Sequence, residues 1–361
     1  MTKVLNVPLG SQHVALLEPV SFKLTTKNER VVEVTADVGY VHRGIEKACE
    51  TKFKFKQIPF VVSRVCGLCS ITHATTSTLA IEKLLNLEVP KKAKYLRILA
   101  LELDRIHSHM LCLAHTAENA GYEALFMRIL RDREHVMELQ EILTGNRVHF
   151  DYVCIGGVNR DFDNDLNSTF EKYLKIFENF TTEIKELFLN NWSLSLKYKG
   201  VGAISADRAL EQSLAGPLIR ACGLKIDVRS EFDFLPYSEL DFNIITSDGG
   251  DVYGRNMVRL DEIFESIRLI RAVINNLPEG DIQTKVKGNP DGEAIVRLEA
   301  PRGELFYYIK GSKKPNLDRV RIKTPTFTNI PSMIDMLKNQ EYANVPAIIA
   351  SFDPCLSCTA K

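Results

Sequence analysis

The sequence predicts an α+β protein that is mainly helical, with a bundle of long helices as its core and small β appendages. Apolar residues recur every three to four positions through long segments in the middle of the chain. Apolar and polar residues alternate near the beginning and again after residue 290. No internal repeat or low-complexity linker divides the 361 residues. We therefore expect one domain, with a β region at 1–40, a helical bundle at 41–290, and a β-hairpin and C-terminal metal-binding segment at 291–361.

Composition excludes several classes of partner and compartment. Acidic and basic residues balance at 46 each, so we expect no binding to nucleic acid or to anionic lipid. The longest apolar runs fall far short of the roughly 18 residues that a membrane span needs, and any membrane association is expected to come through partner proteins. The first ten residues lack a basic start followed by an apolar core, so no secretory signal is expected. In a reduced cytosol the eight cysteines would be thiols rather than disulfides.

The N-terminal region is predicted to form a β-hairpin. Apolar and polar residues alternate from Val14 to Val38 around a polar break at 25–30, which is the pattern of two strands joined by a turn. Glu18 lies just before Pro19 in this region, and on its own a carboxylate there is most often a solvated loop residue.

The middle of the chain is predicted to be helical. Helical periodicity covers residues 73–87, 91–120, 123–143, 162–192, 207–214 and 251–276. Gly145 follows the third of these segments as a stop signal, and Ser205 precedes the fifth as a cap signal. Residues 224–248 have little periodicity and contain Pro236, so we expect loops and extended segments there. Histidines within these helices lie at spacings that do not suggest a metal pair: His107, His109, His115 and His135. We expect them to pack or to hydrogen-bond.

A second β-hairpin is predicted at residues 292–309, where Ala294, Val296 and Leu298 alternate with polar residues before a Pro-Arg-Gly turn. Arg302 lies in this turn, and an arginine in a hairpin turn is ordinarily exposed to solvent.

Two Cys-x-x-Cys motifs suggest a metal centre. Cys66 and Cys69 form one pair, and Cys355 and Cys358 form the other at the opposite end of the chain. Two such pairs supply four thiolates, which favour nickel, zinc, copper or iron–sulfur centres. A zinc ribbon usually places its pairs roughly 15 to 20 residues apart, so a site here would be closed by the fold of the whole chain. The other four cysteines are isolated: Cys49, Cys112, Cys154 and Cys222. We expect them to be small buried hydrophobic residues.

The two motifs resemble the signatures of a known enzyme family. Arg64 to His73 and Asp353 to Cys358 are similar to the first and last signatures of the large subunit of nickel-iron hydrogenases. Gly39 to Lys47 and Asp251 to Arg259 resemble segments shared with the 49-kDa subunit of respiratory complex I. The resemblance extends from Gln12 to the C-terminus and is strongest to the energy-converting, membrane-bound branch. It implies the large-subunit fold and a catalytic subunit that interconverts dihydrogen with protons and electrons.

The resemblance also implies a set of metal ligands. Cys66 and Cys355 would bind nickel terminally, and Cys69 and Cys358 would bridge nickel to an iron ion that carries carbon monoxide and cyanide. His73 would hydrogen-bond a thiolate sulfur without binding metal.

Further site residues follow from the same resemblance. Glu18 would be the first proton carrier beside a nickel-bound thiolate. Pro301 and Arg302 would line the open side of the metal pair, where the guanidinium could hold a cyanide nitrogen, and Asp353 would hydrogen-bond the arginine. Glu46 would help to bind a magnesium or iron ion, although the C-terminal histidine that usually completes that site is missing. A carboxylate favoured by a helix dipole explains Glu46 equally well.

The resemblance implies partner subunits because the chain has no second cysteine cluster for electron transfer. An iron–sulfur small subunit beside residues 66–73, a further hydrophilic ferredoxin-type subunit and antiporter-like membrane subunits are expected, with ferredoxin as the electron carrier. The chain itself would lie at the cytoplasmic face of the membrane, held there by these partners.

Two other interpretations compete with a hydrogenase. A quinone-reducing subunit of the complex I type shares the segments at 39–47 and 251–259, but those relatives lack both cysteine pairs. A structural zinc protein or assembly scaffold would also use four thiolates. Zinc at one per chain without nickel would favour the scaffold.

Overall fold

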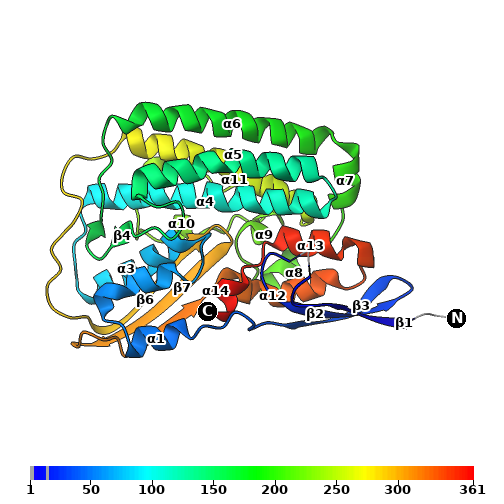
Figure 1. Cartoon of the computed structure of the whole chain (residues 1–361), viewed down its shortest axis with the longest axis horizontal. Coiled ribbons are helices and arrows are strands. Elements are labelled where there is room, and N and C mark those ends of the chain that lie inside the picture. The colour runs from blue at the N-terminus through cyan, green and yellow to red at the C-terminus, as the bar shows by residue number, and fades with distance from the viewer. Residues whose placement is uncertain (1–3, 14–15) are drawn as a thin grey trace.

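The computed structural model describes residues 4–13 and 16–361. Val14 and Ala15, the first residues of the predicted N-terminal hairpin, lie outside the described residues. Long helices lie side by side in one half of the molecule, and sheets and short helices fill the other half (Figure 1). The predicted class, mainly α with small sheets, is confirmed.

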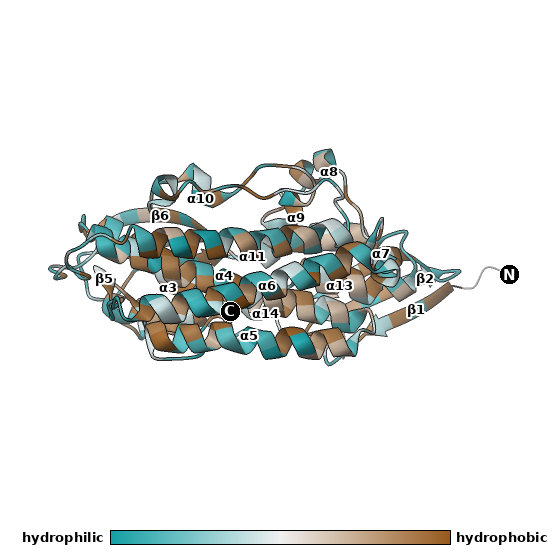
Figure 2. Cartoon of the chain, turned by 90° about the horizontal axis from the view of Figure 1, so that it is seen from above, coloured by the Kyte–Doolittle hydropathy of each residue, from teal (hydrophilic) through white to brown (hydrophobic). Residues whose placement is uncertain are grey.

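Four long helices form the core: α4 (Lys91–Asn119), α5 (Glu123–Thr144), α6 (Leu166–Asn190) and α11 (Val252–Asn275). Buried side chains occur on every face of α4 from Ala93 to Ala117, and this helix packs against α5 and α11. In contrast, α6 buries a stripe that includes Phe170, Leu174 and Phe177, so it lies at the outside of the bundle. Figure 2 shows polar residues interrupting the apolar ones along α5 and α6. None of the described helices is long and apolar enough to cross a membrane.

Local signals set several helix ends. α5 ends at Gly145, which adopts a left-handed φ of 87°, and the side chain of Asp251 accepts a hydrogen bond from Gly254 N at the start of α11. The helix predicted for residues 162–192 is present as α6, which is shorter at both ends, and α7 (Trp192–Tyr198), which was not predicted, follows it. The extended backbone of Asn191 breaks the helix, and its side chain caps α7 through Leu194 N at 3.0 Å.

Three small antiparallel sheets complete the fold. The N-terminal sheet contains β1 (Val4–Leu9), β2 (Ser21–Lys27) and β3 (Arg30–Asp37); the others are β4 (Val153–Cys154) with β5 (Gly157–Val158), and β6 (Asp291–Ala300), β7 (Gly303–Ser312) and β8 (Arg319–Lys323). β2 and β3 form the predicted hairpin, and β1 adds a strand that was not predicted. The turn between β6 and β7 places Pro301 and Arg302 at the end of the C-terminal hairpin.

Short helices connect these parts: α1 (Ile45–Thr51), η1 (Phe55–Gln57), α2 (Ile58–Ser63), α3 (Ser70–Leu84), α8 (Ala206–Glu211), α9 (Pro217–Arg220), α10 (Val228–Glu231), η2 (Tyr237–Leu240), α12 (Pro325–Leu337), η3 (Tyr342–Asn344), α13 (Val345–Phe352) and α14 (Leu356–Ala360). Residues 224–248, predicted as loops and extended segments, contain the single turns α10 and η2. A four-residue turn is too short to produce a periodic pattern in the sequence.

Candidate metal centre

The first cysteine pair lies in the loop between α2 and α3. Cys69 immediately precedes α3, and Cys66 Sγ accepts a hydrogen bond from Leu68 N at 3.3 Å. α3 packs against β6 and β7, so the loop is held beside the hairpin turn that carries Arg302.

The second pair follows a sharp change of direction after α13. Asp353 ends that helix with a left-handed φ of 55°, and Pro354 cannot continue a helix because it has no backbone N–H. Cys355 N then donates to Thr326 Oγ1 on α12 at 3.0 Å, and Cys355 Sγ accepts from Cys358 N at 3.4 Å. These contacts aim both sulfurs of the pair toward the first loop.

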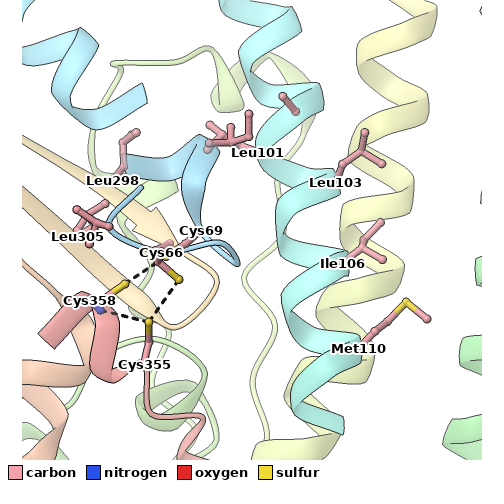
Figure 3. Close-up of a cluster of buried hydrophobic side chains, with 14 of the residues drawn as sticks. Cys66, Cys69, Leu101, Leu103, Ile106, Met110, Leu298, Leu305, Cys355 and Cys358 are labelled. Atoms are coloured by element: carbon pink, nitrogen blue, oxygen red, sulfur yellow. Dashed lines mark hydrogen bonds between the residues drawn. The ribbon is translucent and has the colours of Figure 1, made fainter. Parts of the chain in front are cut away.

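The structure brings all four sulfurs together (Figure 3). Cys66 Sγ lies 3.4 Å from Cys355 Sγ, and Cys69 Sγ lies 3.4 Å from Cys358 Sγ. The four residues are between 2% and 5% exposed. Among the described residues, no other group of three or more His, Cys, Asp or Glu side chains lies close enough to hold a metal ion.

The electrostatics of the cluster favour a cation. Hydrogen bonds from the thiols of Cys355, Cys358 and Cys69 hold the pKa of Cys66 well below its usual range. Burial raises the pKa of Cys358 well above its usual range, because a second buried negative charge lacks a counter-charge. Four sulfurs in a dry pocket therefore fit a soft metal ion, which stabilises all of them as thiolates.

Arg302 borders the same small cavity as the cysteines. Its Nε donates to Asp353 O at 2.9 Å and its Nη2 donates to Asp353 Oδ1 at 2.8 Å. Burial opposes its charge, but Asp353 and the thiolates of the cluster outweigh that effect and raise the pKa of Arg302 well above its usual range. Within the described part of the chain, Arg302 Nη1 is buried without a partner, so it is available to bind an acceptor atom beside the sulfurs. Ala300 lines this cavity from the same turn.

Glu18 is tied to the second cysteine pair and is not a solvated loop residue. Its carboxylate accepts hydrogen bonds from Leu356 N, from Ser357 N at 3.0 Å, and from Ser357 Oγ. The carboxylate therefore lies at the start of α14, one residue beyond Cys355.

His73 lies on the first turns of α3 and faces the cluster. Its Nε2 is 3.4 Å from Cys358 Sγ, and its Nδ1 is 2.7 Å from Tyr307 OH on β7. Burial lowers the pKa of His73 to about 4, so the ring is neutral and has one N–H to donate. Tyr307 was not predicted as a site residue, because in sequence it is only one of the alternating apolar positions of a strand.

The surroundings of Glu46 do not fit a magnesium or iron ion. Its Oε2 accepts from Arg321 Nη1 at 2.7 Å, its Oε1 accepts from Ile322 N at 2.8 Å, and Lys361 Nζ lies 3.9 Å from Oε1. Two cations of the chain already neutralise this carboxylate, and among the described residues it belongs to no group of three or more metal-ligating side chains. The metal-binding role expected of Glu46 therefore stays a prediction, and in the described structure its carboxylate forms ion pairs.

The isolated cysteines lie away from the cluster. Burial raises the pKa of Cys49 and of Cys112 to about 12, which keeps both as unreactive thiols. Cys222 is buried as expected, whereas Cys154 is only half-buried. Two other contacts of the site were not predicted: Thr326, which binds Cys355 N, and Ser357, which binds Glu18. Serines and threonines of this kind carry no distinguishing sequence signal.

Comparisons with protein families give two matches. The description "Nickel-dependent hydrogenase" matches residues 43–117, and the description "Respiratory-chain NADH dehydrogenase, 49 Kd subunit" matches residues 119–288 and 283–361. The first match contains one cysteine pair, and the second contains the other.

Similar proteins are found over nearly the whole chain. A carbon monoxide-induced hydrogenase of Rhodospirillum rubrum is 37% identical over 98% of this chain and 99% of its own. The membrane-bound hydrogenase subunit alpha of Pyrococcus furiosus is 34% identical over 98% of this chain and 87% of its own. A solved chain of the membrane-bound sulfane sulfur reductase, described as an archaeal respiratory membrane complex, superimposes with a TM-score of 0.94 at 26% identity and covers 99% of this chain and 98% of its own.

Proposed function

Since the chain belongs to the family of large subunits of energy-converting membrane-bound hydrogenases, which is related to the 49-kDa subunit of complex I, we propose that it catalyses the interconversion of dihydrogen with protons and electrons. The cluster of four buried cysteine sulfurs carries this proposal. Relatives of the complex I type share the fold, so membership of the family does not by itself assign the activity.

The four cysteines would hold a nickel-iron centre. Cys66 and Cys355 would be terminal ligands of nickel, and Cys69 and Cys358 would bridge nickel to an iron ion carrying carbon monoxide and cyanide. When bound, this centre supplies the two-electron chemistry that splits dihydrogen heterolytically. His73 would donate a hydrogen bond to the thiolate of Cys358 and so stabilise its negative charge.

Arg302 would organise the open side of this centre. Its Nη1 has no partner among the described residues, and Asp353 fixes the guanidinium through two hydrogen bonds. A positioned donor in a dry cavity stabilises negative charge without reorganising during the reaction. Pro301 adds rigidity next to it because its ring fixes the backbone φ angle.

Glu18 would accept the proton that leaves the cysteine sulfur. Its carboxylate contacts the backbone beside Cys355, and it lines a second cavity with Leu16 and His115. A carboxylate in that position can pass a proton outward, away from the metal centre.

Electrons would leave through partner proteins. Among the described residues, no second cysteine cluster exists to hold an iron–sulfur centre. We therefore propose an iron–sulfur small subunit, a further ferredoxin-type subunit, antiporter-like membrane subunits and ferredoxin as partners. They would hold the chain at the cytoplasmic face of the membrane.

Metal analysis and infrared spectroscopy of the purified complex test the proposal. Nickel and iron in equal amounts, with carbon monoxide and cyanide bands and hydrogen-dependent dye reduction, are expected. Cys355→Ser should abolish the bands and the activity, while Cys154→Ser, a half-buried cysteine outside the cluster, should retain both. Zinc at one per chain without nickel would instead show a structural scaffold. A metal-free complex that reduces quinone would show a subunit of the complex I type.

A further inference from the structure

A buried cluster of charged side chains lies on the far side of the hairpin turn from the cysteines. It contains three arginines and four carboxylates, all less than 10% exposed: Arg105, Arg220, Arg229, Glu102, Asp227, Glu262 and Glu299. These residues come from α4, α9, α10, α11, β6 and the segment before α10. We call this group the Arg220 cluster.

Arg220 is the hub of this cluster. Its Nε donates to Glu262 Oε1 at 2.7 Å, and its Nη1 donates to Glu299 Oε1 at 2.7 Å and lies 3.1 Å from Asp227 Oδ2. Glu262 Oε2 also receives a hydrogen bond of 2.7 Å from His109 Nε2. Burial lowers the pKa of His109 to about 4, so the imidazole donates as a neutral ring.

The charges of the Arg220 cluster do not balance. Within the Arg220 cluster three guanidiniums face four carboxylates while His109 is neutral, so the cluster holds one more carboxylate than guanidinium. An unpaired buried charge is strongly unfavourable, and the usual outcome is that one group takes up a proton instead. The cluster therefore binds one proton more than its residues would bind in water.

Contacts identify Glu299 as the group that holds this proton. Glu102 accepts from Arg105, Arg229, Tyr237 and Ser266. Asp227 accepts two hydrogen bonds from Arg229. By contrast, Glu299 Oε2 has one contact, a long 3.4 Å hydrogen bond from Val228 N.

The electrostatics agree with this choice. Burial, together with the charge of Asp227, raises the pKa of Glu299 to about 7, although Arg220 opposes the shift. Charged and titratable groups that surround Glu299 from the neighbouring elements are Arg105, Arg220, Asp227, Arg229, Glu231, Glu262, Arg297, Glu304 and Lys323.

Solvent reaches Glu299 from one side. A surface cavity of about 290 Å³ borders it and is also lined by Glu231, Arg297, Glu304 and Gly216. The backbone of Gly216 meets that of Arg302, since an added Cβ there would lie 2.4 Å from Arg302 O. The strand residues between Glu299 and Arg302 thus separate this cavity from the one at the cysteines.

We propose that Glu299 is a second proton site of the protein, which exchanges one proton between the Arg220 cluster and the surface cavity. It is distinct from Glu18, which lies at the start of α14. Its charge balance involves only residues of the chain, so the site exists whether or not a metal is bound to the cysteines.

Infrared difference spectra recorded across the titration of the purified complex test this site. We expect a carbonyl band of a protonated carboxylic acid at acid pH that disappears at alkaline pH. Glu299→Gln should remove the band, while Glu304→Gln, which changes a partly exposed carboxylate of the same cavity, should keep it. A band that persists in Glu299→Gln, or a wild type that shows an imidazolium of His109 instead, would overturn the proposal.

A second variant separates charge balance from local structure. Glu262→Gln removes one negative charge elsewhere in the Arg220 cluster and leaves three carboxylates against three guanidiniums. Glu299 should then ionise and its band should vanish although Glu299 is present. A protonated-carboxyl band that is unchanged in Glu262→Gln would contradict the proposed charge balance of the Arg220 cluster.

The pH dependence of stability gives an independent measure. Glu299 has a folded pKa of about 7, above its ordinary 4.5, so the folded state holds a proton that the unfolded state has released. Stability should fall as pH rises between these two values and then become constant. Glu299→Gln should lose this slope, and Glu304→Gln should retain it. Equal slopes in wild type and Glu299→Gln would reject the site.

Discussion

At the residue scale, the candidate metal centre depends on polar atoms that the chain leaves without partners. Arg302 uses two of its nitrogens on Asp353 and keeps Nη1 unpaired beside the sulfurs. A buried hydrogen-bond donor without an acceptor lowers stability by roughly 1–3 kcal/mol. A ligand atom that accepts from Arg302 Nη1 would remove this cost and explains why the donor is left unpaired. His73 and Glu18 are fixed by Tyr307 and by the start of α14, respectively.

Arg302→Lys should keep the metals but lower hydrogen turnover about 100- to 1,000-fold, the usual effect of losing one positioned donor. Lysine cannot reproduce the planar fork that Asp353 holds. Arg297→Lys, at a partly exposed ion pair on the same hairpin, serves as the control and should be near wild type. Turnover and metal content measured on both variants decide the point; an active Arg302→Lys enzyme would rule out the role proposed for the guanidinium.

Glu18→Gln should lower turnover about 100- to 10,000-fold, because an amide still accepts hydrogen bonds from α14 but cannot carry a proton. Metal content and melting temperature should change little. Glu33→Gln, at an exposed position of β3 in the N-terminal sheet, is the control for steady-state assays. If both variants turn over equally fast, protons leave by another route.

Lys361→Met should lower the free energy of unfolding by about 1 kcal/mol, since Glu46 would lose one of its two cationic neighbours. Magnesium or a chelator should not change the melting temperature of the wild type, because the carboxylate is already neutralised. A rise in the melting temperature of the wild type on addition of magnesium would show that Glu46 helps to bind a cation.

At the element scale, close backbone contacts fix how the parts of the chain approach one another. Gly157 in β5 lies so near residue 282 that an added Cβ would stand 1.9 Å from Ile282 O. β5 runs next to the middle of the loop between α11 and β6, where Gly157 pairs with Gln283, and Arg97 of α4 donates to Gly157 O. A glycine is needed here for space, because no side chain fits between the two backbones.

Gly157→Ala should therefore destabilise the protein by several kcal/mol, a large effect for a single methyl group, because backbone rather than a flexible side chain must move. Gly10→Ala is the control, since nothing lies within 4 Å of its added Cβ. Chemical denaturation of both variants measures the difference. Equal unfolding free energies would mean that residues 282–284 can shift freely.

At the scale of the whole molecule, the cysteine cluster joins the two ends of the chain. The loop before α3 and the segment after α13 are held together by Cys66–Cys355 and Cys69–Cys358 contacts, and Glu18 adds a link from the N-terminal region. A bound metal ion would convert these weak thiol contacts into strong bonds.

Removing the metal should therefore loosen the ends without melting the helical core. Amide hydrogen exchange should become faster in residues 345–361 and 64–73, while the central part of α4, which is buried on every face, stays protected. Exchange measured on metal-loaded and metal-depleted protein gives the comparison. Uniform acceleration along the chain would show instead that the core also depends on the metal.

The sequence by itself determined those features that depend on local order. Periodicity specified α4, α5 and α11 and the β6–β7 hairpin, because helices and strands place apolar residues at fixed intervals. Two Cys-x-x-Cys pairs indicated a thiolate metal site, since spacing alone lets both sulfurs of a pair reach one ion. The short helix α7 and the single turn of α10 were missed, because both are too short for a periodic pattern and begin at capping side chains, Asn191 and Asp227.

Only the tertiary structure decided which groups meet across the chain. It paired Cys66 with Cys355 and directed Arg302 toward the sulfurs instead of solvent. It also placed the Glu46 carboxylate beside Arg321 and Lys361. It enclosed four carboxylates with three guanidiniums in the Arg220 cluster. Burial and charge balance arise from residues far apart in sequence, so no local pattern contains them.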